Sequence, residues 1–135
     1  MSFSQAISSV LSNYANFQGR ATRSEYWYWT LFYIILEVVL MAVNGVARHI
    51  PLINLVVAAA VFVIVLGLFI PTLAVGFRRI HDIDKSAWWL LIGLIPLGGL
   101  VLLIFFCMPG TQGSNRFGGS SFATSGPMPM PVGYN

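Results

Sequence analysis

Three long apolar segments constrain the fold of this chain more than any other feature of its sequence. They cover residues 26–45, 52–77 and 87–108. Each is long enough to cross the hydrocarbon core of a membrane, which takes about 20 residues of helix. Among all Asp, Glu, Lys and Arg residues, only Glu37 lies inside them. We therefore predict an all-α integral membrane protein with three transmembrane helices, preceded by a short amphipathic interfacial helix.

The composition of the chain agrees with an apolar environment. Of its 135 residues, 57% are hydrophobic and 8% charged, whereas about a quarter of the residues of a soluble domain are charged. A single Cys excludes a disulfide framework within the chain and a multi-cysteine metal site. The net charge of +3 is too dispersed for a nucleic-acid surface. We expect no enzyme activity, no cofactor, no metal site and no nucleic-acid partner.

Residues 1–25 combine a short amphipathic helix with a basic segment. Apolar side chains recur at helical spacing over residues 3–14, and Ser2 with Gln5 fits a capping box at the start of the helix. We expect this helix to lie in the plane of the membrane interface. It could act only as an anchor, or it could sense lipid composition.

The remainder of the chain divides into two parts. Residues 26–108 form the predicted three-helix transmembrane bundle, and residues 109–135 form a flexible tail rich in Gly, Ser and Pro. The end of the tail is either unstructured or an extended strip that binds a partner, because prolines alternate there: Pro127, Pro129 and Pro131.

The third apolar segment allows two topologies. Pro96, Gly98 and Gly99 lie in its middle and could bend it into a re-entrant hairpin. Each arm of such a hairpin would have only about ten residues and would expose irregular backbone to lipid. We therefore prefer a full crossing.

The distribution of positive charge predicts the orientation of the three spans. One side carries five Lys and Arg residues and the other carries two, which places the N-terminus in the cytoplasm and the C-terminus outside. The first group comprises Arg20, Arg23, Arg78, Arg79 and Lys85, and the second comprises Arg48 and Arg116. Anionic lipid headgroups at the cytoplasmic face are the expected lipid partners.

Glu37 is the first candidate for a functional residue. Tyr33, Glu37 and Asn44 lie on one face of the first span, where a carboxyl group is costly. The face could contact another membrane protein, or bind a proton or cation. Alternatively, the carboxyl group could be protonated and hydrogen-bonded between helices.

Small residues form a stripe on the second span. Ala60, Gly67 and Ala74 lie seven residues apart and would allow close approach of another helix. The partner helix could belong to the same bundle or to another chain.

The most polar loop covers residues 78–86. His81 and Asp82 are adjacent there, but no nucleophile or second base accompanies them at a defined spacing. We expect the charges to pair instead. Glu25 and the carboxylates of the loop would neutralise arginines across the two cytoplasmic segments.

Four ordered blocks of this chain resemble the YhaH/YhaI-type family of small bacterial inner-membrane proteins, a domain of unknown function. The blocks run from Tyr14 to Trp27, from Pro71 to Asp82, from Ser86 to Pro96 and from Pro109 to Gly118. The resemblance implies a bacterial inner membrane and three spans, but no activity. Its signature positions have no assigned role: Gly19, Arg20, Arg23, Glu25, Trp27, Arg78, Arg79, His81, Asp82, Trp88, Trp89, Asn115 and Arg116.

Two functional hypotheses follow. The first is a non-enzymatic accessory, scaffolding or assembly subunit that associates with another integral membrane protein or complex, or with itself. The alternative is a small oligomeric channel or transporter for protons, ions or a small solute, with Glu37 in its path.

Overall fold

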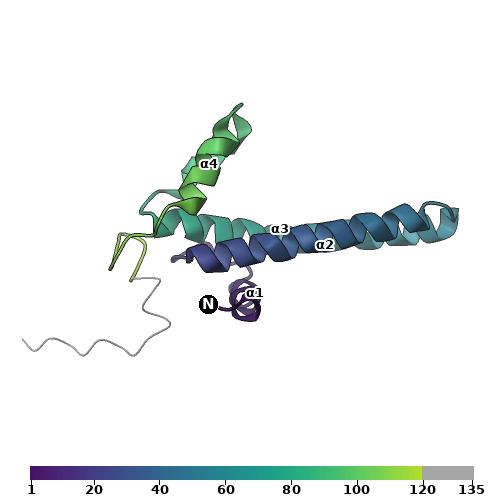
Figure 1. The fold of residues 1–135 in the computed structure, drawn as a ribbon, viewed down its shortest axis with the longest axis horizontal. Helices are drawn as coiled ribbons and strands as arrows, with labels where there is room; N and C mark the ends of the chain where they lie inside the picture. The colour runs from purple at the N-terminus through teal and green to yellow at the C-terminus, as the bar shows by residue number, and fades with distance from the viewer. Residues whose placement is uncertain (120–135) are drawn as a thin grey trace, which may run out of the picture.

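The computed structural model describes residues 1–119, and this part of the chain is helical apart from its turns and loops (Figure 1). Residues 120–135 lie outside the description, so the interpretations of the proline-rich end stay predictions. The elements are α1 (Phe3–Ser12), α2 (Arg23–Ala47), α3 (Pro51–Asp82), the 3-10 helix η1 (Ala87–Leu94) and α4 (Gly98–Cys107).

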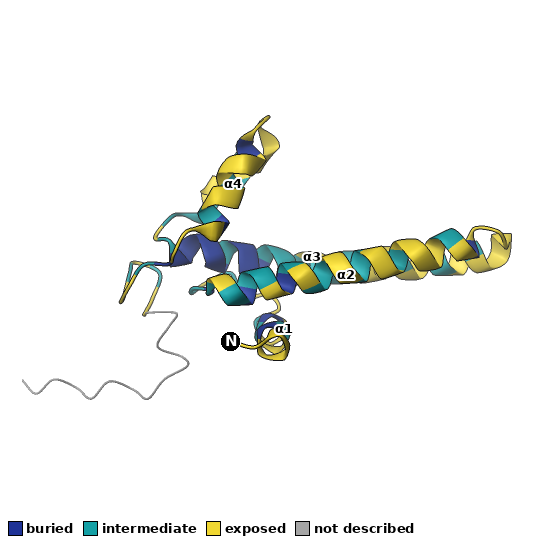
Figure 2. Ribbon diagram, in the orientation of Figure 1, coloured by how far each residue is buried: buried dark blue, intermediate teal, exposed yellow. Residues whose placement is uncertain are grey.

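Helices α2 and α3 lie antiparallel and extend away from the rest of the molecule as a long arm (Figure 1). We use "the arm" for residues 31–47 and 51–70. No residue of 51–70 is buried, and Figure 2 shows exposed positions along most of this region. Two helices contact each other along one side only, so most of the apolar surface of the arm is not covered by residues 1–119.

The core lies at the opposite end of α3. Beginning with Pro71, the helix contributes most of its residues to the buried interior, although no residue before Pro71 is buried. Val75 packs there with Val10, Ala21 and Trp29. Helix α1 reaches this core and lies crosswise to the arm (Figure 1). The predicted capping box of α1, formed by Ser2 and Gln5, is confirmed.

The predicted single helical crossing over residues 87–108 is wrong. The segment consists of η1 and α4, which fold back on each other as a hairpin. Pro96 lacks an N–H, and Leu97 adopts a left-handed backbone conformation with φ of 67°, so the helix cannot continue through the turn. Gly98 completes the turn, because a Cβ atom there would lie 1.6 Å from the Ile92 carbonyl oxygen.

The chain after the hairpin returns to the end of α3 at which the hairpin began. The backbone N–H of Thr111 donates to the Asp82 carbonyl over 2.7 Å. Residues 109–119 are therefore held against the core, unlike the flexible tail expected there. Arg116 was predicted to share a side with Arg48, but it pairs with Asp84 at 3.3 Å.

Candidate functional site

Buried charges converge where α3 meets the segment before α2. We define "the arginine cluster" as Arg20, Arg78 and Arg79 with Glu25 and Asp82. Its ion pairs are Arg78–Glu25 at 2.8 Å, Arg20–Asp82 at 2.9 Å and Arg79–Asp82 at 2.6 Å. The predicted pairing of Glu25 and Asp82 with arginines across the two segments is therefore confirmed.

Asp82 holds two arginines and the returning chain. Its carboxylate accepts from Arg20 Nε and Arg79 Nη1, and its carbonyl accepts from Thr111. Gly110 packs directly on this carboxylate, since a Cβ atom there would lie 1.9 Å from Oδ2. Only glycine allows the backbone to approach so closely.

Arg79 fixes the end of the hairpin. It donates to the carbonyls of Phe106, Met108 and Ala21 as well as to Asp82. Burial lowers the pKa of Arg79, and the Asp82 carboxylate acts in the opposite direction. The ion pair with Asp82 favours the charged form of the guanidinium.

Glu25 connects α1 with α3. Its Oε1 accepts from Ser9 at 2.9 Å and from Arg78 Nη1 at 2.8 Å. The α2 N-cap Thr22 accepts from the Glu25 backbone N–H. Glu25 lies in the first turn of α2. The positive end of the helix dipole stabilises the negative charge of the carboxylate there.

The His81 side chain packs against neighbouring residues and is not arranged for acid–base chemistry. Its Nδ1 lies 3.0 Å from the Gly19 carbonyl, and its ring stacks on Phe117 with 4.0 Å between centroids. The residue lies beyond the apolar stretch 51–70. Burial lowers the pKa of His81 below 6.5, while the hydrogen bond to Gly19 opposes the shift and the charge of Arg116 adds to it.

Four further signature residues connect the hairpin or the returning chain with the start of α2 or the end of α3. Arg23 and Trp27 donate to the carbonyls of Cys107 and Phe106, and Asn115 donates to that of His81. Arg116 Nη2 donates to the Asp84 carbonyl at 2.9 Å.

The other two signature tryptophans differ from Trp27, because their side chains are exposed. Trp88 and Trp89 are exposed on η1, with the Lys85 ammonium 5.5 Å from the Trp89 ring centroid.

Within residues 1–119, no three His, Cys, Asp or Glu side chains are grouped as a metal site would need.

A family model described as "Protein of unknown function (DUF805)" matches residues 14–119. The chain belongs to this DUF805 family. It is 41% identical over 112 residues to the inner membrane protein YhaI of Escherichia coli K12, covering 82% of this chain and 89% of that protein. It is 43% identical over 110 residues to the inner membrane protein YhaH of the same strain, covering 81% and 89%. No solved structure matches.

These relatives confirm the resemblance and the prediction of a bacterial membrane protein of unknown function. The family match begins at Tyr14 and ends at Gly119, so it includes the whole arginine cluster and the returning chain. Ser9 lies before the match. The cluster therefore lies within the part of the chain that the family model covers, whereas its contact from α1 comes from a residue before that part.

Glu37 of this DUF805 protein lies on the arm, outside the arginine cluster. It is half-buried, and Tyr33 is its hydrogen-bonding neighbour. Asn44 is exposed. No ion pair includes Glu37 within residues 1–119. Its predicted role in contact with a partner stays a prediction.

The small-residue stripe is only partly covered by the chain itself. Ala74 is buried, and the Gly67 carbonyl accepts a hydrogen bond from the Tyr14 hydroxyl. Ala60 is exposed. Five half-buried residues of α3 lie on another face: Val57, Val61, Val65, Leu68 and Thr72. A contact of Ala60 with another chain stays a prediction.

Sequence reasoning assigned no role to four residues that support the cluster: Ser9, Tyr14, Gly110 and Phe117. Ser9 lies on the polar face of the amphipathic helix, which is the only local signal for its contact with Glu25. Tyr14, Gly110 and Phe117 belong to the blocks shared with the family, but their partners are more than 25 residues away along the chain, so spacing alone could not reveal them.

Proposed function

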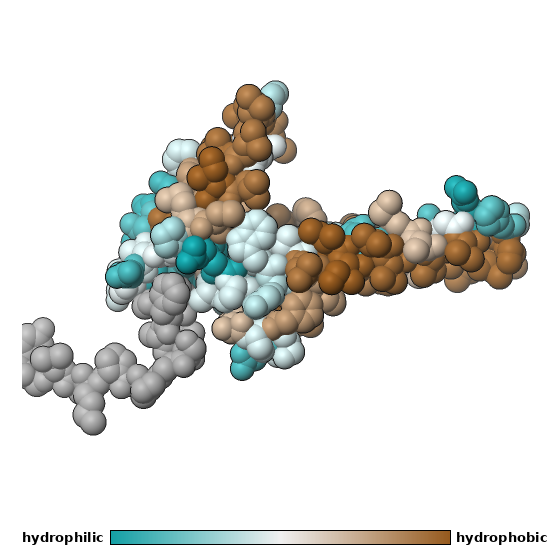
Figure 3. Space-filling view, viewed as in Figure 1, coloured by the Kyte–Doolittle hydropathy of each residue, from teal (hydrophilic) through white to brown (hydrophobic). Residues whose placement is uncertain are grey.

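We propose that this DUF805 protein is a non-enzymatic accessory or assembly subunit that associates in the inner membrane with another integral membrane protein or with a second copy of itself. The observation that carries this proposal is the arm, an apolar two-helix extension with one carboxyl group and little internal covering. Figure 3 shows the apolar surface over the arm and α4, and hydrophilic surface at the end near α1.

The length of the arm supports a membrane-crossing role. Residues 51–70 extend about 30 Å as a helix, which equals the usual thickness of the hydrocarbon core. Met41 lies one turn after Glu37 on the same face and is 70% exposed, and Val38, the next residue after Glu37, is 60% exposed. A charged side chain costs roughly 2.5–3.5 kcal/mol at the centre of a span. A partner that supplies a donor or a cation to Glu37 would offset this cost.

The fold also supports a revised topology for the proposal. In it α2 and α3 cross the membrane, α1 lies in the interface, and the η1–α4 hairpin enters and leaves on one side. Both chain ends then face the cytoplasm. Arg116 joins the five basic residues on that side and leaves Arg48 on the other, which strengthens the charge bias that sets orientation.

Reporter fusions test this topology. A reporter after residue 135 is expected to be active in the cytoplasm, and a cysteine placed at Ile50 is expected to be labelled from outside the cell. A C-terminal reporter that is active only outside would contradict the hairpin topology.

Native purification tests the association itself. Protein extracted in mild detergent should elute in a complex larger than a monomer, and Glu37→Leu should dissociate it. Val39→Leu is the matched control, because Val39 is an exposed apolar residue on the same helix. Monomer alone from the unaltered protein would overturn the proposal. Proton or ion flux in proteoliposomes that Glu37→Gln abolishes would favour the channel instead.

A further inference from the structure

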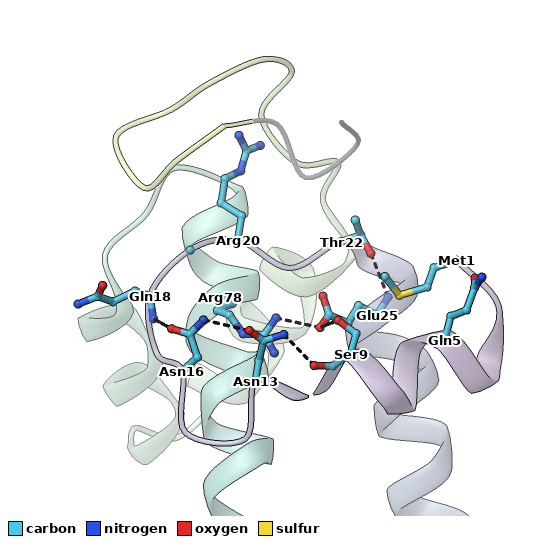
Figure 4. Close-up of a pocket in the computed structure, with 11 residues that line it drawn as sticks. Met1, Gln5, Ser9, Asn13, Asn16, Gln18, Arg20, Thr22, Glu25 and Arg78 are labelled. Atoms are coloured by element: carbon cyan, nitrogen blue, oxygen red, sulfur yellow. Dashed lines mark hydrogen bonds and ion pairs between the residues drawn. The ribbon is translucent and has the colours of Figure 1, made fainter. Parts of the chain in front are cut away.

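A polar pocket lies beside Arg78, between the arginine cluster and α1. Its volume is about 640 Å³, and Ser9, Asn13, Gln18 and Glu25 are among the residues that line it. Figure 4 shows the Arg78 guanidinium among these side chains, with its ion pair to Glu25. Pockets that bind small molecules commonly have volumes of about 300–1,000 Å³.

One edge of the Arg78 guanidinium has no hydrogen-bond partner. Nη1 donates to Glu25, but Nε and Nη2 are buried and donate to no group in residues 1–119. These two nitrogens form the parallel pair of donors with which arginine binds a carboxylate or phosphate in two-point fashion. Buried donors without acceptors are unfavourable, so an oxygen ligand that accepts from this edge would be stabilising.

The charge of the arginine cluster points to an anion. Three arginines, Arg20, Arg78 and Arg79, face only two carboxylates, Glu25 and Asp82. All five side chains are no more than 5% exposed. The cluster therefore carries one uncompensated buried positive charge, which is costly unless a counterion lies close to it.

We propose that this pocket binds an oxoanion, the phosphate of an anionic phospholipid headgroup or a free phosphate, on the Nε and Nη2 edge of Arg78. The bound anion neutralises the cluster and supplies the missing acceptors. The inference does not depend on the proposed association, because the pocket lies at the opposite end of the molecule from the distal part of the arm.

The test measures binding to the purified full-length protein in a neutral detergent. The probes are inorganic phosphate and short-chain phosphatidylglycerol, with phosphatidylcholine as the uncharged lipid control. Arg78→Lys keeps the charge but removes the two-point edge, so we expect binding to weaken at least about tenfold. Circular dichroism and size-exclusion chromatography check that the variant is folded.

A second pair of variants keeps the test decisive if Arg78→Lys does not fold. Gln18→Glu adds a negative charge to an exposed residue of the pocket wall, and Gln112→Glu makes the same change outside the pocket. We expect only Gln18→Glu to weaken binding, by several-fold.

The probes also separate the two sources of the anion. Binding of phosphatidylglycerol without binding of inorganic phosphate identifies a lipid site, and binding of both identifies a general phosphate site. The proposal is overturned if the unaltered protein binds neither probe, or if Gln18→Glu and a folded Arg78→Lys variant bind as tightly as the unaltered protein. Ordered water would then be the acceptor on Arg78.

Discussion

The Tyr14 hydroxyl donates a hydrogen bond to the Gly67 carbonyl. In a regular helix this carbonyl would accept from the backbone N–H of residue 71, but Pro71 has none. The segment after α1 thus supplies the donor that the proline removes. α3 continues through Pro71 as one helix, and the carbonyl that lacks its helical donor becomes a point of contact between the segment after α1 and the arm.

A double-mutant cycle tests this relationship. Tyr14→Phe should lower the free energy of unfolding by about 1 kcal/mol, because a buried or partly buried acceptor loses its donor. Pro71→Ala restores the backbone N–H, so Tyr14→Phe should cost clearly less in that background. The free energies come from denaturant titration in mixed micelles. Equal costs in both backgrounds would mean that the Tyr14 hydroxyl does not replace the helical donor.

The buried pair Arg78–Glu25 should matter far more than the exposed pair Arg116–Asp84. Glu25→Gln leaves a buried guanidinium without its carboxylate, and breaking such a pair costs about 3–5 kcal/mol. Asp84→Asn affects side chains that are 61% and 46% exposed, where an ion pair contributes about 0–1 kcal/mol. The same titration measures both variants. If Glu25→Gln and Asp84→Asn lowered the free energy of unfolding by similar amounts, the burial of the cluster would be contradicted.

The hairpin between η1 and α4 depends on Gly98. A Cβ atom there would lie 1.6 Å from the Ile92 carbonyl oxygen, so Gly98→Ala should destabilise the protein by roughly 1–3 kcal/mol, as overpacking does. Gly99→Ala is the matched control, since a Cβ atom at Gly99 meets nothing within 4 Å. A Gly98→Ala variant as stable as Gly99→Ala would show that residues 87–108 do not fold back in this way.

His81 should make stability depend on pH. Burial lowers the pKa of His81 in the folded protein below 6.5, so below that pH the unfolded chain binds a proton that the folded chain does not. The stabilisation is complete above pH 6.5 and is lost as the pH falls toward the pKa of the folded state. Thermal unfolding midpoints at pH 7.5 and 5.5 measure it.

The matched control for His81 is the second histidine of the chain. His81→Gln should reduce the loss of stability at low pH, and His49→Gln, at an exposed position, should leave it unchanged. An identical pH dependence in both variants would exclude His81 as its source.

Much of the fold follows from local sequence patterns. The scarcity of charges in the first two apolar segments, where Glu37 is the single exception, predicts α2 and α3. The capping pair Ser2 and Gln5 predicts the start of α1. The signs of Glu25 and Asp82 predict that they pair with arginines. These features are predictable because they depend on hydropathy, on residues within one helical turn, or on charge alone.

The same patterns could not decide whether the third apolar segment is a single helix or a hairpin. Its length permits either a crossing or a hairpin, and Pro96 with Gly98 permits a turn without requiring one. The hairpin is held by contacts from distant residues, mainly Arg79 with the carbonyls of Phe106 and Met108. Such long-range hydrogen bonds have no signature in local spacing.

The sequence by itself determined that this chain is a helical membrane protein of the DUF805 family, because a long apolar helix without charges is stable in lipid whatever surrounds it. Only the tertiary structure decided which arginines are buried, which carboxylates they share, and that Arg78 keeps one edge unpaired. Those properties depend on the packing of α1, α3 and the returning chain around the arginine cluster. Water is excluded there, so an unpaired charge or hydrogen-bond donor costs free energy.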